Sequence, residues 1–157
     1  MYSFGKSSTA CLTTCEPLLV AVATRALGYG VMDFGIVYGY RGERLQNRLN
    51  RDGASKVVYP DSYHNKNPSQ ALDAVPYVPG IGRITGHPTQ IWGIAASTHK
   101  SQKVVGQQVF AMFGRMAGLF EAASKELDIP ITWGNDWDSD GSVFDTGFAD
   151  LGHFQLK

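Results

Sequence analysis

The sequence of 157 residues has little cysteine, no excess of charge of either sign and no long apolar run. Its two cysteines, Cys11 and Cys15, are too few for a disulfide framework, so we expect free thiols made in a reducing compartment. The 14 basic and 14 acidic side chains balance, which argues against a protein dedicated to binding DNA or RNA. No stretch reaches the roughly 18 apolar residues of a membrane helix, so we expect no stable membrane insertion.

The order of the predicted elements indicates the α+β class. No internal repeat or low-complexity linker divides the chain, so residues 1–157 are predicted to form a single domain. One helix is expected from a cap at Thr14 to Leu27, and the strongest apolar periodicity predicts a long core helix over 105–127. Residues 78–103 are rich in Gly, Pro, Ser and Thr, and their structure stays open. The remaining predictions are an amphipathic helix over 43–52, a loop over 54–70, and strands over 34–40, 71–77, 129–133 and 151–156.

Two of the four histidines lie near carboxylates in the sequence. His64 is followed nine positions later by Asp73, which enters an apolar strand, where a carboxylate is costly to bury unless it is paired or binds a metal. His153 follows Asp150 at the start of another predicted strand. The histidines His87 and His99 match no motif, and we expect them in loops.

Together, His64, Asp73 and His153 would supply the three protein ligands of an open catalytic zinc site. Zinc lowers the pKa of bound water to about 7, and Asp150 could accept the proton. The alternative is that these are ordinary polar residues, because no Cys-x-x-Cys or His-Glu-x-x-His motif supports zinc.

Several segments along the chain occur in an order that is typical of one protein family. They are Phe4-Gly5-Lys6-Ser7, Gly39-Tyr40-Arg41-Gly42, Gly53-Ala54-Ser55-Lys56-Val57, Ser62-Tyr63-His64-Asn65, Ala71-Leu72-Asp73, Trp133-Gly134-Asn135-Asp136-Trp137 and Asp150-Leu151-Gly152-His153-Phe154. Together these segments resemble the VanY-type zinc peptidases, a family that includes phage endolysins with L-alanyl-D-glutamate endopeptidase activity and D-alanyl-D-alanine carboxypeptidases. The resemblance implies the small α+β zinc-peptidase fold shared with hedgehog domains, with an antiparallel sheet and flanking helices.

The resemblance also implies a role for each site residue. The zinc ligands fall on His64, Asp73 and His153, and the catalytic carboxylate falls on Asp150. Arg41 matches the family's active-site arginine, which would hold a substrate carboxylate or the developing oxyanion; the alternative is a surface ion pair at a helix start. The chain departs from the family at residues 78–105, which are longer and richer in glycine and concern one wall of the cleft.

The function implied is that of a phage endolysin, a zinc-dependent L-alanyl-D-glutamate endopeptidase that cuts the stem peptides of bacterial peptidoglycan. We expect a monomer made in the host cytoplasm and released to the cell wall through a holin. Two alternatives stay open. The same residues would serve a D-alanyl-D-alanine carboxypeptidase or dipeptidase, and a non-catalytic wall- or calcium-binding domain can share the fold.

The acidic segment 136–145 is similar to the first half of an EF-hand calcium loop. Carboxylates fall at loop positions 1, 3 and 5, and glycine falls at position 6. Position 12 is Gly147 where calcium loops carry glutamate, so weak calcium binding and a solvated acidic turn are both open. Bound calcium could order the loop and regulate the nearby zinc site. The oxygen donors would be Asp136, Asp138, Asp140, the carbonyl of Ser142, and Asp145.

Overall fold

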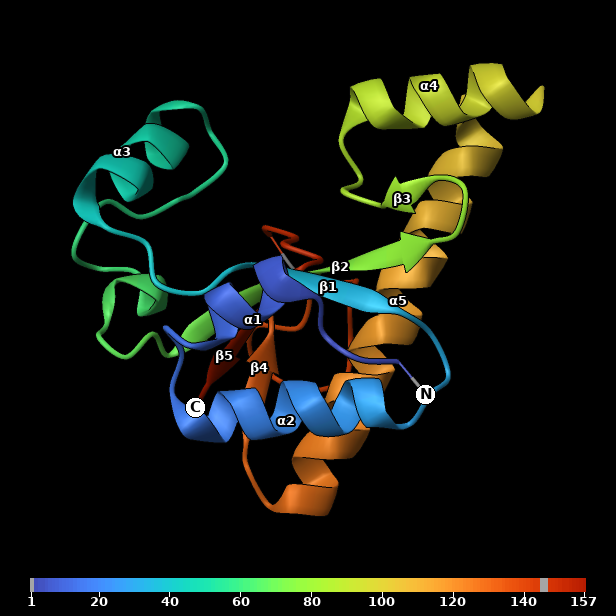
Figure 1. Ribbon diagram of the computed structural model, residues 1–157. Coiled ribbons are helices and arrows are strands. Elements are labelled where there is room, and N and C mark those ends of the chain that lie inside the picture. The colour runs from blue at the N-terminus through green and yellow to red at the C-terminus, as the bar shows by residue number, and fades with distance from the viewer. Residues whose placement is uncertain (1, 145–146) are drawn as a thin grey trace.

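The computed structural model of the chain describes residues 2–144 and 147–157. It has the α+β architecture expected from the sequence, with an antiparallel sheet flanked by helices (Figure 1). The elements follow in the order α1 (Lys6–Leu12), α2 (Pro17–Gly28), β1 (Phe34–Tyr38), α3 (Glu43–Arg51), the short 3₁₀ helix η1 (Tyr63–Asn65), β2 (Ala71–Val78), β3 (Gly82–Arg83), α4 (Pro88–Thr98), α5 (Gln102–Leu127), β4 (Ile131–Trp133) and β5 (His153–Leu156).

The sheet has the strand order β1-β2-β5-β4, and β3 pairs with the far end of β2. The pairings among these five strands are antiparallel. The first six residues of β2 are buried, as a strand in the middle of a covered sheet requires. The register places Asp73 of β2 directly opposite His153 of β5.

The alternation of side chains along these strands separates a core face from a site face. Leu72 and Phe154, which lie opposite each other, are fully buried on the core face. There the ring of Phe154 stacks on Phe120 of α5 with the centroids 4.0 Å apart. Asp73 and His153, one position along each strand, therefore point to the opposite face.

The long helix α5 confirms the helix predicted over 105–127. It begins at a Ser101 cap, whose hydroxyl accepts the N–H of Val104, and ends at Asp128 in the left-handed conformation. Helix α2 packs against α5 and crosses it in the view of Figure 1, and an ion pair of 2.8 Å joins Arg25 to Glu126. The periodic residues that α5 buries are Val105, Val109, Phe113, Met116, Ala117, Phe120 and Ala123.

The region before α2 differs from the sequence prediction. Residues 6–12 form the separate helix α1, and α2 begins at Pro17 rather than at a Thr14 cap. The Thr14 hydroxyl instead donates to the Cys11 carbonyl (2.6 Å) and accepts the N–H of Tyr40 (2.9 Å), so it fixes the turn between the two helices. Both cysteines are free thiols, as predicted, and burial raises the pKa of Cys15 to about 11.

Residues 78–103, which the sequence left open, contain β3 and α4. His87 caps α4 by accepting the N–H of Thr89 on its ring, and His99 ends the helix in the left-handed conformation. Helix α4 packs on α5 at the end of the molecule far from α3 (Figure 1). Within the described ranges, no helix combines the length and apolar character needed to cross a bilayer.

Candidate metal centre and active site

Three metal-donor atoms converge on the site face of the sheet. His64 Nε2 lies 3.2 Å from Asp73 Oδ1 and 3.2 Å from His153 Nδ1, and His153 Nδ1 lies 3.3 Å from Asp73 Oδ1. The three residues are only 1%, 9% and 6% exposed, in the order His64, Asp73 and His153. The structure thus brings together the three residues predicted as zinc ligands.

Hydrogen bonds on the far side of each ring show which nitrogen is free to bind a metal. His64 Nδ1 lies 2.7 Å from the Gly39 carbonyl, and His153 Nε2 lies 3.0 Å from Gln155 Oε1. Because both oxygens are acceptors, these nitrogens carry the protons in neutral rings. The lone pairs of His64 Nε2 and His153 Nδ1 then face the Asp73 carboxylate. Three acceptors this close repel one another unless a cation lies among them, so the cluster fits a divalent metal.

The electrostatics of the cluster favour an ionised Asp73. Burial opposes its charge, but the neighbouring His64, His153 and Arg41 side chains hold the pKa of the carboxyl well below its usual value. Burial lowers the pKa of His64. Burial acts in the same direction on His153, but Asp73 and Asp150 outweigh it and raise the pKa of that ring.

Two glycines, Gly39 and Gly134, let backbone segments pack closely around the triad. A Cβ at Gly39 would lie 2.5 Å from the Cys11 carbonyl and 2.7 Å from Cys15 Sγ, so only glycine lets the chain after β1 pass the α1–α2 turn. A Cβ at Gly134 would lie 2.5 Å from the Asp150 carbonyl oxygen. Gly39 thereby delivers its carbonyl to His64, and Gly134 lets the segment with Asp150 pack close to β4.

The segment that carries His64 is fixed by its own side chains. Ser62 Oγ accepts the N–H of His64, and Asn65 Oδ1 accepts the N–H of Ser62, a reciprocal cap on η1. Asn65 Nδ2 also donates to the Arg41 carbonyl at 2.7 Å. These bonds hold the two segments with His64 and Arg41 against each other.

Arg41 lies inside the site. Its side chain is buried, Nη2 donates to Asp73 Oδ2, and its guanidinium carbon lies 4.8 Å from the Tyr38 ring centroid. The alternative of a surface ion pair is therefore wrong. The contact with Asp73 leaves Oδ1 of that carboxylate to face the two histidines.

Two adjoining cavities of about 870 Å³ and 440 Å³ meet at the triad, and Arg41, Ala54 and Asp150 line both. The larger also reaches Arg83, and the smaller is bounded in part by Trp137. Trp137 thus forms part of a cleft wall, and its ring centroid lies 5.4 Å from that of His153. Trp133 belongs to the core. A cleft that extends to both sides of the metal ligands suits an extended peptide.

Asp150 lies at the junction of the two cavities. Its N–H donates to the Gly134 carbonyl at 2.7 Å, and its own carbonyl accepts the N–H of His153 at 3.0 Å. Burial and the charge of Asp73 raise the pKa of the Asp150 carboxyl. A carboxylate beside a metal site whose pKa is shifted toward neutrality is suited to accept and return a proton.

The acidic loop forms a second cluster in which Asp136, Asp138 and Asp140 place carboxylate oxygens within 4.8 Å of one another. Asp136 accepts the N–H groups of Asp140 and Gly141 at 3.1 Å each, and Gly141 has a φ of 88°. This turn matches the glycine expected at loop position 6. Ser142 donates its N–H to Asp140 (2.6 Å). Of the other predicted calcium donors, Asp145 lies outside the described residues.

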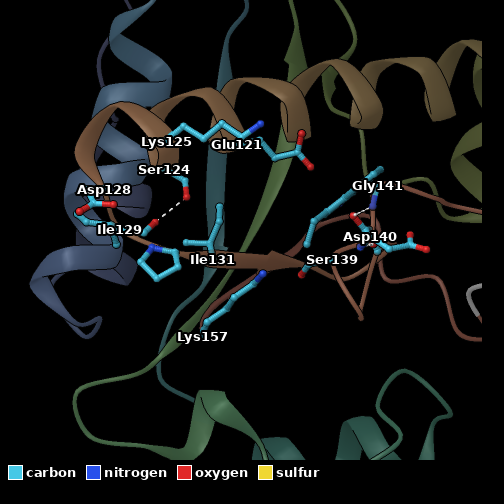
Figure 2. Close-up of a pocket in the computed structure, with 13 residues that line it drawn as sticks. Glu121, Ser124, Lys125, Asp128, Ile129, Ile131, Ser139, Asp140, Gly141 and Lys157 are labelled. Atoms are coloured by element: carbon cyan, nitrogen blue, oxygen red, sulfur yellow. Dashed lines mark hydrogen bonds between the residues drawn. The ribbon is translucent and has the colours of Figure 1, made fainter.

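The acidic loop also borders a separate hollow, away from the histidines, at the C-terminal end of α5. Figure 2 shows Glu121, Lys125 and Lys157 around this hollow, with Asp140 and Gly141 at its edge. Burial and the charge of Asp136 raise the pKa of Glu121. The acidic loop therefore lies between two hollows, because Trp137 in the same segment lines the smaller cavity beside the triad.

Sequence reasoning missed three residues that support the site, Gly39, Gly134 and Gln155. Gln155 had a detectable signal, because it lies two positions after His153 in a strand and so shares its face. The two glycines lie in segments quoted for the family resemblance, but no local pattern shows which backbone they approach.

A buried His-Asp-His cluster in a cleft on one face of an α+β sheet is the arrangement of a metallopeptidase domain. The chain is 32% identical over 161 residues to the L-alanyl-D-glutamate peptidase of Escherichia phage T5, in an alignment that covers 99% of this chain and 98% of the phage protein. It belongs to the L-alanyl-D-glutamate peptidase family.

The fold has a counterpart among solved structures. The crystal structure of the L-Ala-D-Glu endopeptidase ChiX of Serratia marcescens matches with a TM-score of 0.67 and 22% identity, over 99% of this chain and 90% of that one. No protein-family model matches the chain. The structural match supports the fold expected from the resemblance.

Proposed function

We propose that this protein is a phage endolysin, a zinc-dependent L-alanyl-D-glutamate endopeptidase that cuts the stem peptides of peptidoglycan. The observation that carries the proposal is the convergence of the three donor atoms beside Asp150, in a cleft open to both sides, in a chain of this family. The breadth of the cleft favours cleavage within a peptide over removal of a terminal residue.

The donor set favours zinc as the resident metal. Two neutral imidazoles and one carboxylate are a known catalytic zinc set, in which a fourth position stays open. When bound, zinc supplies Lewis acidity that polarises the scissile carbonyl and makes water acidic enough to attack near neutral pH. The ordered hydrogen bonds to Gly39 and Gln155 keep both rings in the tautomers that this binding needs.

In this mechanism, Asp150 takes the proton of the attacking water and later delivers it to the leaving amine. Its raised pKa and its position between the two cavities support the role. General acid–base catalysis of this kind contributes about 10²- to 10⁴-fold in rate.

Arg41 orients the Asp73 ligand and adds positive charge where the oxyanion develops. Its bond to Asp73 Oδ2 and its burial support this choice between the two roles that the resemblance implies. A guanidinium already engaged by a ligand is less available to hold a substrate carboxylate.

Calcium is a second proposed cation. Asp136, Asp138 and Asp140 would bind it weakly, with Ser142 and Asp145 as further donors, and binding would order the segment that leads to Asp150. Calcium would then act as a regulator of turnover, without taking part in the chemistry.

The remaining elements of the proposal concern the whole molecule. The 157 residues would act as a single peptidase domain and a monomer, made in the host cytoplasm and released to the wall by a holin. Helix α5 contacts β2, β4 and α2, and the buried residues of these elements form one hydrophobic core. This shared core supports a single domain.

Digestion of purified peptidoglycan followed by mass analysis of the fragments tests the proposed activity. We expect fragments with a new N-terminal D-glutamate. Release of free D-alanine would assign the chain to the carboxypeptidases, and absence of any cleavage by zinc-loaded protein would support a non-catalytic binding domain.

A further inference from the structure

Arg83 is a cation at the cleft that the proposed mechanism does not use. It lies in the short strand β3, opposite Tyr77 of β2, and its side chain lines the larger cavity together with Arg41 and Asp150. β3 belongs to the stretch 78–105, in which the chain departs from the family it resembles, so the local motifs assign it no role.

Contacts from three elements hold the Arg83 side chain and backbone. Nη2 donates to Ser7 Oγ of α1 at 2.6 Å, and Gln90 of α4 donates to the Arg83 carbonyl. The guanidinium passes over Gly35 of β1, where a Cβ would lie 3.6 Å from Nε and 3.8 Å from Nη2. A long cationic side chain held in this way loses little further freedom when it binds an anion.

Among the described residues, Arg83 has no anionic partner. In the part of the chain that the structure describes, Arg25 pairs with Glu126 and Arg41 pairs with Asp73, but no carboxylate lies within ion-pair distance of Arg83. The thiol of Cys11 is no substitute, because burial raises its pKa despite the charge of Arg83. Within the ranges that the structure describes, the guanidinium donates a hydrogen bond only to Ser7, which leaves its other donors for the cavity.

The substrate supplies the missing anion. A D-glutamate residue has two carboxyl groups, of which one continues the peptide, so the other stays ionised close to the scissile bond. The C-terminal carboxylate of the stem peptide is a second source of the same chemistry. Arginine binds carboxylates through paired, charge-assisted hydrogen bonds.

We propose that Arg83 forms a carboxylate-binding subsite that anchors the anionic stem peptide in the larger cavity. This inference rests on the proposed function and adds a determinant of substrate choice to it. The division of roles follows from the contacts. Arg41 is engaged by Asp73 at the metal cluster, whereas Arg83 is held at the cavity wall by Ser7 and pairs with no carboxylate of the described residues. The subsite would favour substrates whose carboxylate is free over their amidated forms.

The test measures kcat/KM of zinc-loaded wild type and Arg83→Gln on three synthetic stem peptides. One peptide has both carboxylates free, one has the D-glutamate carboxylate amidated, and one has the C-terminal carboxylate amidated. For wild type we expect one of the two amidations to lower kcat/KM by about 10- to 100-fold, the range of a hydrogen bond to a charged group. On the peptide with both carboxylates free, Arg83→Gln should lower kcat/KM by the same factor. The same variant should cleave the free peptide and that amidated peptide with equal kcat/KM.

Two controls separate binding from structure. Arg48→Gln removes an exposed arginine of α3 and should leave the response to amidation as in wild type. Arg83→Lys keeps the charge and should recover part of the discrimination. Zinc content and thermal stability should be equal in all of these variants.

Each other outcome overturns the subsite. If the wild type cleaves the free peptide and both amidated peptides equally well, the enzyme recognises neither carboxylate. An Arg83→Gln variant that keeps the wild-type response to amidation would make Arg83 structural. Failure of wild type to cleave any peptide would overturn the proposed function and the subsite together, whereas release of D-alanine would replace the function and still let the amidation series decide the subsite.

Discussion

The two clusters of potential metal ligands in this protein differ in how their donor atoms are held. In the triad, each side chain is held by a hydrogen bond on the side that faces away from the other two. His64 bonds to the Gly39 carbonyl, His153 bonds to Gln155, and Asp73 accepts from Arg41. In the acidic loop, Asp136 is buried, but its carboxylate oxygens accept hydrogen bonds from backbone N–H groups of its own turn. The side chains of Asp138 and Asp140 are exposed.

This difference predicts different affinities and different consequences of metal loss. A cluster whose ligands are already ordered binds a cation without further loss of side-chain entropy, whereas exposed aspartates must be ordered when the ion arrives. The triad also offers imidazole nitrogen, which suits zinc, and the loop offers only oxygen, which suits calcium. We therefore expect tight zinc binding at the triad and weak calcium binding at the loop.

The largest expected effect comes from His64→Ala. Removal of a buried ligand should abolish both zinc retention and lysis of peptidoglycan, because two remaining ligands cannot hold the metal in the open geometry. Metal analysis of the purified variant checks the first point and a turbidity assay the second. His99→Asn, which changes an exposed histidine at the end of α4 to a residue that tolerates the left-handed conformation, is the matched control. Full zinc content in His64→Ala would contradict the triad.

Asp150→Asn should separate catalysis from metal binding. Asparagine cannot accept the proton, so turnover should fall by about 10²-fold or more while zinc content stays at the wild-type level. A variant that loses zinc, and then turns over at the native rate once zinc is restored, would show that Asp150 is a ligand or a bystander.

Arg41→Lys tests the contact that orders the metal ligand Asp73. Lysine keeps the charge but lacks the planar group that can reach both Asp73 and the oxyanion, so we expect turnover to fall by at least about tenfold, with folding retained. Circular dichroism and kcat measured on the same samples check the two parts. Native activity of Arg41→Ala would remove Arg41 from the mechanism.

The smallest effect is expected at the acidic loop. Calcium added at millimolar concentration to zinc-loaded protein should shift the NMR resonances of the loop and change the rate of lysis about twofold, in the range expected for a weak site. Asp138→Asn should remove both responses and leave the zinc content unchanged. Absence of both responses in the wild type would leave the loop as a solvated acidic turn.

The sequence was most informative where one local pattern determines the structure. The apolar period of α5 and the costly aspartate in an apolar strand both predicted what the structure shows, because each is a matter of burial along a single element. Helix α4 escaped prediction because its 11 residues have weak apolar periodicity. Contacts between distant segments could not be predicted either, because sequence spacing carries no information about them. Examples are the contact of Arg41 with Asp73, 32 residues away, and the close approach of Gly39 to Cys11.

The register of β2 against β5 makes the metal a reporter of cooperative unfolding. Asp73 and His153 are 80 residues apart in the chain, and His64 and His153 are 89 apart, so the donor atoms meet only after the non-local strand pairing has formed. Such pairings form late and slowly, since the closure of a long loop precedes any stabilising contact. Any opening that separates these two strands also separates the predicted ligands. Zinc bound at the triad would therefore stabilise the fully paired sheet relative to every partly open form. The rate at which a chelator strips the metal should therefore report how often β2 and β5 come apart.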